Sequence, residues 1–253
     1  MDEGSIATFP QFHGYVKRLA DIFDWDYPAV QVWLPGDNDI GGENEPIYLN
    51  KIVQLEKVFS QQNVITYSNV SFYAVNAITY TFPQKTDEPP GTENNFKIAV
   101  SHYPVTMRVM FAKKIMNAIN PQIFFCAHDH ESKYVKQHKD LTHKVTTWFN
   151  APKSTLSLTF DDDLLYEIYV PTCSYRMGTS YIGFGAAVIE NNYKTMRYTV
   201  FWSPTRFPYL FLYLAILVAL LVYCLVFFAA RLFLRKVKSS TKKGDMSPLL
   251  ERI

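Results

Sequence analysis

The sequence predicts a layered α/β (α+β) sandwich followed by one C-terminal transmembrane helix. Three observations lead to this fold class. Helical and strand-like patterns alternate through about residue 130, a run of strand-like segments follows, and residues 207–230 form one long uncharged stretch. Alternating elements followed by a run of strands are typical of sheets covered by helices. We therefore expect a folded domain over 1–206, a membrane helix over 207–230 and a basic tail over 231–253.

The elements follow from local periodicity and composition. Apolar residues at helical spacing predict helices, and short runs rich in β-branched and aromatic residues predict strands. In the first half we expect a helix over 6–23, a short buried strand over 30–34, a helix over 51–59, two or three strands within 63–82, a polar loop over 84–95, a strand from 96 ending at His102, a helix over 110–119 and a strand from 122 ending before the His-Asp-His loop. In the second half we expect strands within 165–175, 181–190 and 196–202.

The composition agrees with a folded domain. The 253 residues are 48% hydrophobic and 16% aromatic, which is ample for a core. A net charge of +2 argues against a nucleic-acid partner. The three cysteines, Cys126, Cys173 and Cys224, form neither a CxxC pair nor a disulfide framework, so they leave the redox compartment open.

Residues 207–230 are expected to cross a membrane. These 24 residues carry no charge, and as a helix they would extend about 36 Å, against about 30 Å for a hydrocarbon core. A buried helix of a globular protein seldom stays apolar on all sides for so long. A single span argues against a channel or transporter subunit.

The charges after the span predict its orientation. The tail carries Arg231, Arg235, Lys236, Lys238, Lys242, Lys243 and Arg252. The positive-inside rule places this tail in the cytosol and residues 1–206 in the lumen or outside. The N-x-S sequence beginning at Asn69 is compatible with that side. Residues 245–250, DMSPLL, fit an acidic dileucine sorting pattern, although two adjacent leucines also arise by chance.

Polar and metal-ligating side chains gather where apolar strands are predicted to end. The stretch WLPGDNDIGGENEPI (33–47) places Asp37, Asn38 and Asp39 after one strand, and an ordinary turn would use the same residue types. His102 ends a second strand, and a His-Asp-His loop over 128–130 ends a third. Loops at the carboxyl ends of strands form sites in open α/β sheets. Imidazole and carboxylate donors suit Mn, Fe or Zn, so the sequence predicts a metal site here.

Three short blocks resemble the calcineurin-like metallophosphoesterases. PGDND (35–39), SHYP (101–104) and AHDH (127–130) are similar to that family's G-N-H-[DE] block, its lone His after a strand and its G-H-x-H block. Residues 170–190 and 198–214 resemble the membrane-bound branch, which includes the GPI-anchor ethanolamine-phosphate phosphoesterases and the yeast cell-division-control homologues. The remaining histidines, His13, His138 and His143, lie in helical or lysine-rich polar stretches and are expected to be solvated.

The resemblance implies a binuclear centre. Asp37, His102 and His128 would hold one divalent metal and His130 the other, with manganese as the expected ion. Two such metals activate a water molecule for in-line attack on phosphorus. The implied substrate is a phosphodiester on a lipid- or glycan-linked molecule, and the implied location is the endoplasmic reticulum or Golgi. The implied role includes removal of ethanolamine phosphate from GPI anchors in support of ER-to-Golgi transport.

The sequence departs from the family pattern in ways that leave a second function open. The family's D-x-H block is not found within the 253 residues, and MDEGS resembles the end of its G-D-x-x-D block, with Asp2 as the second Asp. We therefore expect a longer parent protein and an incomplete catalytic centre in this chain. Asn38 occupies the position of the usual His, and an amide cannot act as a general acid. The alternative is a catalytically inactive, membrane-bound relative that acts in trafficking or interaction.

Overall fold

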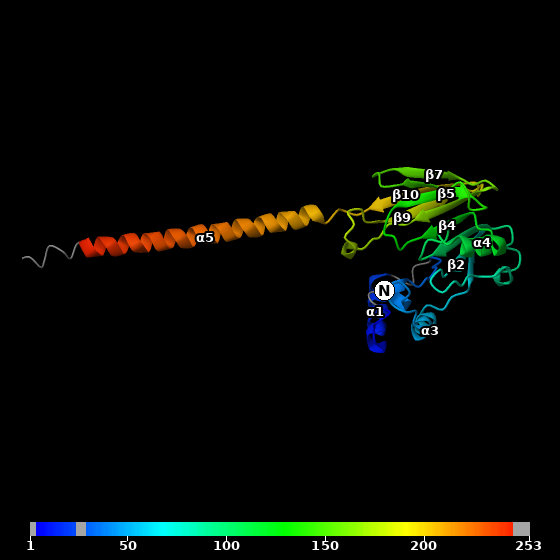
Figure 1. Cartoon of the computed structure of the whole chain (residues 1–253), viewed down its shortest axis with the longest axis horizontal. Coiled ribbons are helices and arrows are strands. Elements are labelled where there is room, and N and C mark those ends of the chain that lie inside the picture. The colour runs from blue at the N-terminus through cyan, green and yellow to red at the C-terminus, as the bar shows by residue number, and fades with distance from the viewer. Residues whose placement is uncertain (1–3, 24–28, 245–253) are drawn as a thin grey trace, which may run out of the picture. The chain divides into compact units, whose positions relative to one another are not determined.

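The computed structural model describes residues 4–23 and 29–244, with side chains through residue 238 (Figure 1). It divides into two compact units, and the division falls between Ser203 and Pro204. The predicted tail pattern over 245–250 lies outside the described residues, as does Asp2.

The helices of the first unit agree with the sequence analysis. Its α-helices are α1 (Phe9–Ile22), α2 (Asp37–Ile40), α3 (Leu49–Val58) and α4 (Val109–Ala118), and two 3₁₀ helices are η1 (Lys85–Asp87) and η2 (Tyr175–Met177). The predictions of helices at α1, α3 and α4 are confirmed. The one-turn helix α2 lies where the sequence indicated a loop after a strand.

A mixed sheet of seven strands forms the centre of this unit. Its strands are β1 (Val64–Tyr67), β2 (Val70–Val75), β3 (Phe96–Ser101), β4 (Ile123–Cys126), β5 (Lys133–His138), β6 (Val145–Trp148) and β8 (Leu164–Tyr169). The spatial order is β1-β2-β3-β4-β8-β5-β6. Strands β2, β3, β4 and β8 are parallel to one another, and the other neighbours are antiparallel. The segments that follow β3 and β4 therefore emerge at the same edge of the sheet.

A smaller antiparallel sheet packs against one face of the large one. It consists of β7 (Thr155–Thr159), β9 (Gly183–Ile189) and β10 (Thr195–Trp202), with β10 in the middle. Ile98 and Ile123 of the large sheet share one buried cluster with Met196 and Tyr198 of the small sheet. This burial accounts for the alternation of buried and exposed residues along β10.

Helix α4 covers the opposite face of the large sheet. Phe111 and Ile115 of α4 lie in a second buried cluster with Ala99 of β3 and Phe124 of β4. The unit is therefore a helical layer, a mixed sheet and a second sheet, in agreement with the predicted layered α/β sandwich (Figure 1).

The prediction of a buried strand over 30–34 is wrong. This segment is irregular, and Val30 is exposed. The backbone of Trp33 pairs with a side chain instead of a strand, since its N–H donates to Gln61 Oε1 at 2.7 Å and its carbonyl accepts from Gln61 Nε2 at 2.6 Å. The Trp33 ring lies 4.9 Å from that of Phe59. The apolar residues of the segment thus pack through side chains, without a partner strand.

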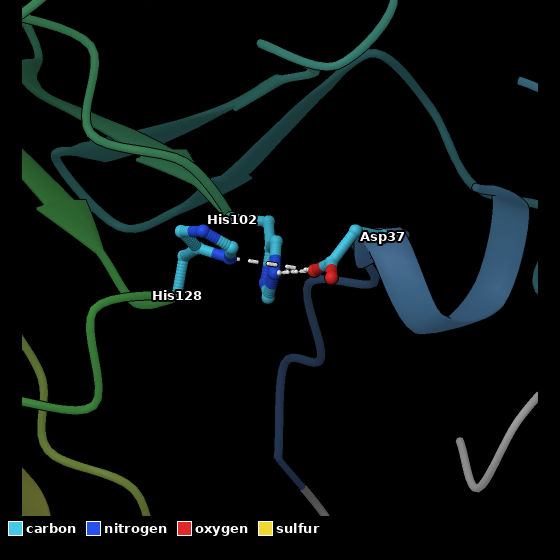
Figure 2. A group of neighbouring side chains, drawn as sticks. All are labelled: Asp37, His102 and His128. Atoms are coloured by element: carbon cyan, nitrogen blue, oxygen red, sulfur yellow. Dashed lines mark hydrogen bonds and ion pairs between the residues drawn. The ribbon is translucent and has the colours of Figure 1, made fainter. Parts of the chain in front are cut away.

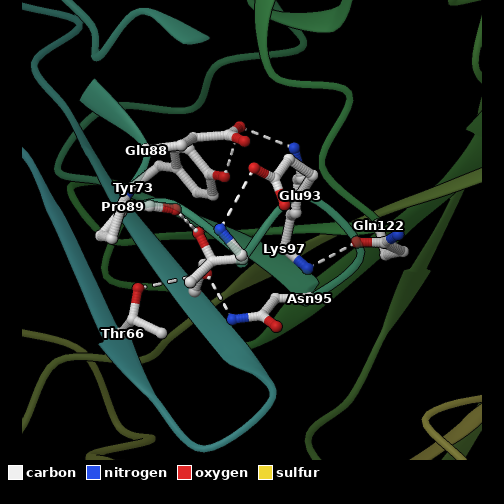
Figure 3. Close-up of polar contacts among 11 residues, drawn as sticks. Thr66, Tyr73, Glu88, Pro89, Glu93, Asn95, Lys97 and Gln122 are labelled. Carbon is white, nitrogen blue, oxygen red and sulfur yellow. Dashed lines mark hydrogen bonds and ion pairs between the residues drawn. The ribbon is translucent and has the colours of Figure 1, made fainter. Parts of the chain in front are cut away.

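The predicted polar loop over 84–95 is tied to the amino end of β3 (Figure 3). Glu88 accepts hydrogen bonds from the Tyr73 hydroxyl at 2.7 Å and from Lys97 Nζ at 2.6 Å. The Glu88 side chain is only 3% exposed, so its charge is compensated by an ion pair. The same contact and burial raise the pKa of Tyr73 far above its ordinary value. The loop is therefore ordered at the end of β3 opposite to His102.

The second unit contains helix α5 (Phe207–Gly244). Over Phe207–Lys238, 32 residues, it is long and apolar enough to cross a membrane, and its most apolar stretch has no buried residue. One such helix agrees with the predicted span over 207–230.

Candidate metal centre

Three of the predicted ligands meet at one place (Figure 2). His102 directly follows β3, His128 follows β4 by two residues, and Asp37 is the first residue of α2. Among the described residues, these three form a group whose ligand atoms all lie within 4.8 Å of one another. Two parallel neighbouring strands thus deliver the histidines, and a separate one-turn helix delivers the carboxylate.

One carboxylate oxygen lies at the centre of the group. Oδ1 of Asp37 is 2.5 Å from His102 Nε2 and 3.5 Å from His128 Nδ1. The two imidazole rings lie 5.4 Å apart at 72°, so that both present a nitrogen to the same oxygen. Asp37 is 7% exposed, and the side chains of His102 and His128 are 23% and 22% exposed.

The electrostatics of the group keep Asp37 ionised. Its hydrogen bond with His102 holds the pKa of Asp37 well below the ordinary value, although burial acts in the opposite direction. A carboxylate that stays charged while it is nearly buried is the state that binds a cation. The site therefore combines one anionic oxygen with two imidazole nitrogens.

Backbone contacts hold the three loops together. The Ala127 N–H donates to the His102 carbonyl at 3.0 Å, which links the segments after β3 and β4. At the start of α2, the Asp39 carboxylate accepts from the Gly36 N–H at 2.9 Å and fixes the turn that presents Asp37. A Cβ on Gly36 would lie 3.2–3.4 Å from three atoms of the His102 ring, so this position leaves little room for a side chain.

The His-Asp-His loop has an unusual backbone. His128 and His130 both lie in the left-handed region, with φ of 60° and 57°. Non-glycine residues adopt this conformation at a cost of about 1–3 kcal/mol, and such residues cluster at functional sites. Because of this conformation, His128 and His130 do not follow the regular side-chain alternation of a β-strand.

The remaining predicted residues are not part of the three-residue group. His130 is half-buried beside it, and burial, reinforced by the neighbouring imidazoles of His128 and His102, lowers its pKa. Asn38 is exposed, and with Asp37 it lines a cavity of about 210 Å³. His13, His138 and His143 are exposed, as expected.

The structure adds two residues that the sequence analysis did not single out. Glu43 Oε1 lies 3.8 Å from Nε2 of His128, whereas Asp37 lies near the other ring nitrogen, Nδ1. The Tyr103 ring lies 4.0 Å from the His128 ring at 51°. Burial, with the charges of Asp37 and Glu43, raises the pKa of Tyr103 to about 12, so its hydroxyl stays protonated. Glu43 belongs to the same Gly- and Asp-rich stretch as Asp37, which could have indicated it.

The donor set fits a divalent metal of the N/O-binding kind. A nearly buried, ionised carboxylate and two imidazoles from rigid strand ends match the ligands of Mn²⁺, Fe²⁺ and Zn²⁺, whereas the nearest cysteine by sequence, Cys126, is buried and has its pKa raised by burial. The described residues thus provide one metal-binding triad of Asp37, His102 and His128.

Comparisons with known proteins give one match. No family model matches the sequence, and no curated protein matches it. Among solved structures, a metallophosphoesterase from Sphaerobacter thermophilus aligns with a TM-score of 0.30 and 12% sequence identity. The alignment covers 61% of this chain and 53% of that chain, so this chain spans about half the length of the protein it matches. A TM-score this low carries no argument about function.

Proposed function

We propose that this chain carries metal-binding loops of a metal-dependent phosphoesterase that acts on phosphodiesters. The observation that carries the proposal is the position of Asp37 Oδ1 between His102 Nε2 and His128 Nδ1, in a group assembled from two strand ends and one helix start. The three sequence blocks that resemble those of the calcineurin-like metallophosphoesterases support the phosphorus chemistry.

Each residue of the triad has a defined part in this proposal. Asp37, His102 and His128 would hold the metal, which would supply Lewis-acid polarisation of a phosphoryl oxygen and a water of lowered pKa. Tyr103 packs on His128 and limits the rotation of its ring. Glu43 Oε1 lies 3.8 Å from Nε2 of His128, so its negative charge would favour a proton on that nitrogen while Nδ1 faces the metal. Asn38 can orient an oxygen but cannot protonate a leaving group.

The finer proposal follows the sequence resemblance. Two manganese ions would bind, with His130 as a ligand of the second. The substrate would be ethanolamine phosphate on GPI anchors or another lipid- or glycan-linked phosphodiester, and the enzyme would support ER-to-Golgi transport. The long apolar helix α5 supports attachment to a membrane, and the assignment to the secretory pathway follows from the sequence resemblance.

An inactive relative is the second candidate function. The observation that favours it is Asn38, whose amide side chain is exposed at the cavity beside Asp37. The resemblance implies a histidine that acts as a general acid at this position. A protein of this kind would bind metal without turnover and act as a membrane-bound trafficking or interaction partner.

Metal titration and hydrolysis measured together distinguish these functions. The full chain in detergent is titrated with MnCl₂ by calorimetry and assayed with bis(p-nitrophenyl) phosphate. Asp37→Ala and His128→Ala should each weaken Mn²⁺ binding by more than about 100-fold, since loss of outer ligand contacts alone costs about 10–100-fold. His143→Ala is the matched control, because this imidazole is exposed and outside the group.

The possible results distinguish the enzyme, the inactive relative and the absence of a metal centre. Binding with hydrolysis, both abolished by Asp37→Ala, supports the enzyme. Binding without hydrolysis supports the inactive relative, and in that case Asn38→His should introduce turnover if the missing acid is the cause. Equal Mn²⁺ binding by the wild type and Asp37→Ala would overturn the metal centre itself.

A further inference from the structure

A buried carboxyl group contacts the segment that follows His102 without belonging to the candidate metal centre. Glu167 is in the middle of β8 and is 0% exposed. It pairs in register with Phe124 of β4 on one side and Val135 of β5 on the other. Its neighbours along the strand, Tyr166 and Ile168, face the small sheet, so Glu167 points to the helical face.

Glu167 makes three hydrogen bonds to one short segment. Its Oε1 accepts from the Val105 N–H at 2.6 Å and from the Thr106 N–H at 3.1 Å, and its Oε2 accepts from the Thr106 hydroxyl. Val105 is 0% exposed and Thr106 is 3% exposed, so water cannot replace these contacts. A buried amide that loses its acceptor is left with its full desolvation penalty. The segment therefore has one favourable position relative to β8.

This segment is the continuation of the loop that carries His102. Thr106 is four residues after His102, and the intervening Tyr103 stacks on His128 at 4.0 Å. The other end of the loop is fixed by β3, whose last residue is Ser101. Glu167 belongs to β8, which lies two places away from β3 in the sheet. It thus fixes the end of the loop that is farther from β3.

We propose that Glu167 and Thr106 are positioning residues for the metal centre, and that they act by fixing the His102–Thr106 loop. The inference rests on the proposed function for its effect on metal binding, but the loop contacts are independent of any metal. A purely structural role would lower stability throughout the unit. If the two residues position the loop, their substitution makes the loop less ordered. It also weakens metal binding by more than the loss of stability explains.

The test compares two threonines that each donate one side-chain hydrogen bond. Thr106→Val removes the hydroxyl hydrogen bond to Glu167 Oε2 and leaves the two backbone N–H contacts in place, whereas Thr106→Ser retains the hydroxyl. Thr199→Val is the matched control, because the Thr199 hydroxyl donates to the Ser154 carbonyl at 2.7 Å in the small sheet. Glu167→Gln is a milder second variant, since its amide oxygen still accepts from the two backbone N–H groups.

Two measurements are made on the full chain in detergent. Without metal, amide hydrogen exchange over residues 101–108 should accelerate in Thr106→Val and stay at the wild-type rate in Thr106→Ser and Thr199→Val. With MnCl₂ alone as the ligand, Thr106→Val should bind about 10–100-fold more weakly, with recovery in Thr106→Ser. Glu167→Gln should fall between the wild type and Thr106→Val in both measurements.

The inference is overturned if Thr106→Val and Thr199→Val lose similar thermal stability while exchange over 101–108 stays at the wild-type rate in both. It is also overturned if a wild type that binds Mn²⁺ keeps its affinity in Thr106→Val. A wild type that binds no Mn²⁺ refutes the proposed function, and the exchange comparison then decides by itself whether Glu167 positions the loop.

Discussion

Asp37 and Glu167 are both nearly excluded from water, yet their surroundings move their pKa values in opposite directions. Asp37 accepts from an imidazole that carries a positive charge when protonated, which lowers its pKa despite burial. Glu167 accepts from neutral amides and a hydroxyl, and burial dominates, which raises its pKa. The first carboxyl is therefore suited to bind a cation, and the second to hold a loop.

The raised pKa of Glu167 predicts a pH-dependent stability. A carboxyl with a folded pKa above its unfolded value of about 4.3 binds its proton more tightly in the folded state. Its contribution to the free energy of unfolding is therefore full below about pH 4.3 and falls as the pH rises towards the folded pKa, by at most about 1.4 kcal/mol per pH unit. Glu167→Gln does not titrate, so the stability of the wild type relative to this variant should decrease over that range. Urea unfolding from pH 4 to 9 measures the difference, and parallel curves would contradict the prediction.

The two carboxyl groups also differ in how well the sequence predicts them. Asp37, His102 and His128 follow apolar runs or Gly-Pro turns, and that placement predicted that they would meet. Glu167 lies inside a strand, where a polar residue usually faces solvent. Its role depends on the register of β8 with β4 and β5, which arises from pairings distant in sequence. The proximity of Glu43 to His128 likewise depends on the tertiary fold, although its position in the same Gly- and Asp-rich stretch as Asp37 is a signal in the sequence.

At the scale of elements, the one-turn helix α2 depends on the glycines that flank it. Gly41 ends the helix with its N–H donating to the Asp37 carbonyl at 2.7 Å and has a φ of 82°. A Cβ there would lie 2.2 Å from the Pro46 carbonyl oxygen. The conformation of Gly41 thus allows the 42–46 segment to fold back over the helix that presents Asp37.

Gly41→Ala should destabilise the domain more than Gly91→Ala. Both glycines have a φ of 82°, so both substitutions carry a backbone cost of about 1–3 kcal/mol, and the ψ of −174° at Gly41 lies in a region that is almost exclusive to glycine. A Cβ on Gly91 meets nothing within 4 Å, whereas the one on Gly41 collides with backbone. Gly41→Ala should therefore lose clearly more unfolding free energy than Gly91→Ala, and it should also weaken Mn²⁺ binding through Asp37. Chemical denaturation of both variants tests the first point. Equal losses of unfolding free energy would show that the collision with Pro46 has no effect.

Elements were predicted well where the hydrophobic pattern is strong. The apolar runs of β3 and β4 and the periodicity of α4 identified them without tertiary information. The segment over 30–34 has the same composition as a strand, but Gln61 takes the place of a partner strand. Strands β5, β6 and β7 were missed, because they are rich in Lys, Gln and Thr and are stabilised by cross-strand pairing and not by a continuous apolar run.

At the scale of the whole molecule, the helix α5 and the exposed Asn69 bear on the same question of topology. Asn69 lies in the turn between β1 and β2, where Tyr67 pairs with Val70. The hydroxyl of its sequon, on Ser71, is 0% exposed in the folded sheet, so a glycan would have to be attached before the sheet forms. An exposed turn accommodates such a glycan without a change in packing.

We expect the first unit to be lumenal, because the seven basic residues after the apolar stretch favour a cytosolic tail. Glycan transfer takes place only on the lumenal side, which makes Asn69 a reporter of orientation. When the chain is expressed in mammalian cells behind a cleavable signal peptide, it should show a glycosidase-sensitive mass shift that Asn69→Gln abolishes. A sequon engineered into the tail, tested in the Asn69→Gln background, should remain unmodified. Modification of the tail sequon in place of Asn69 would show that the basic residues after the apolar stretch over 207–230 do not set the orientation.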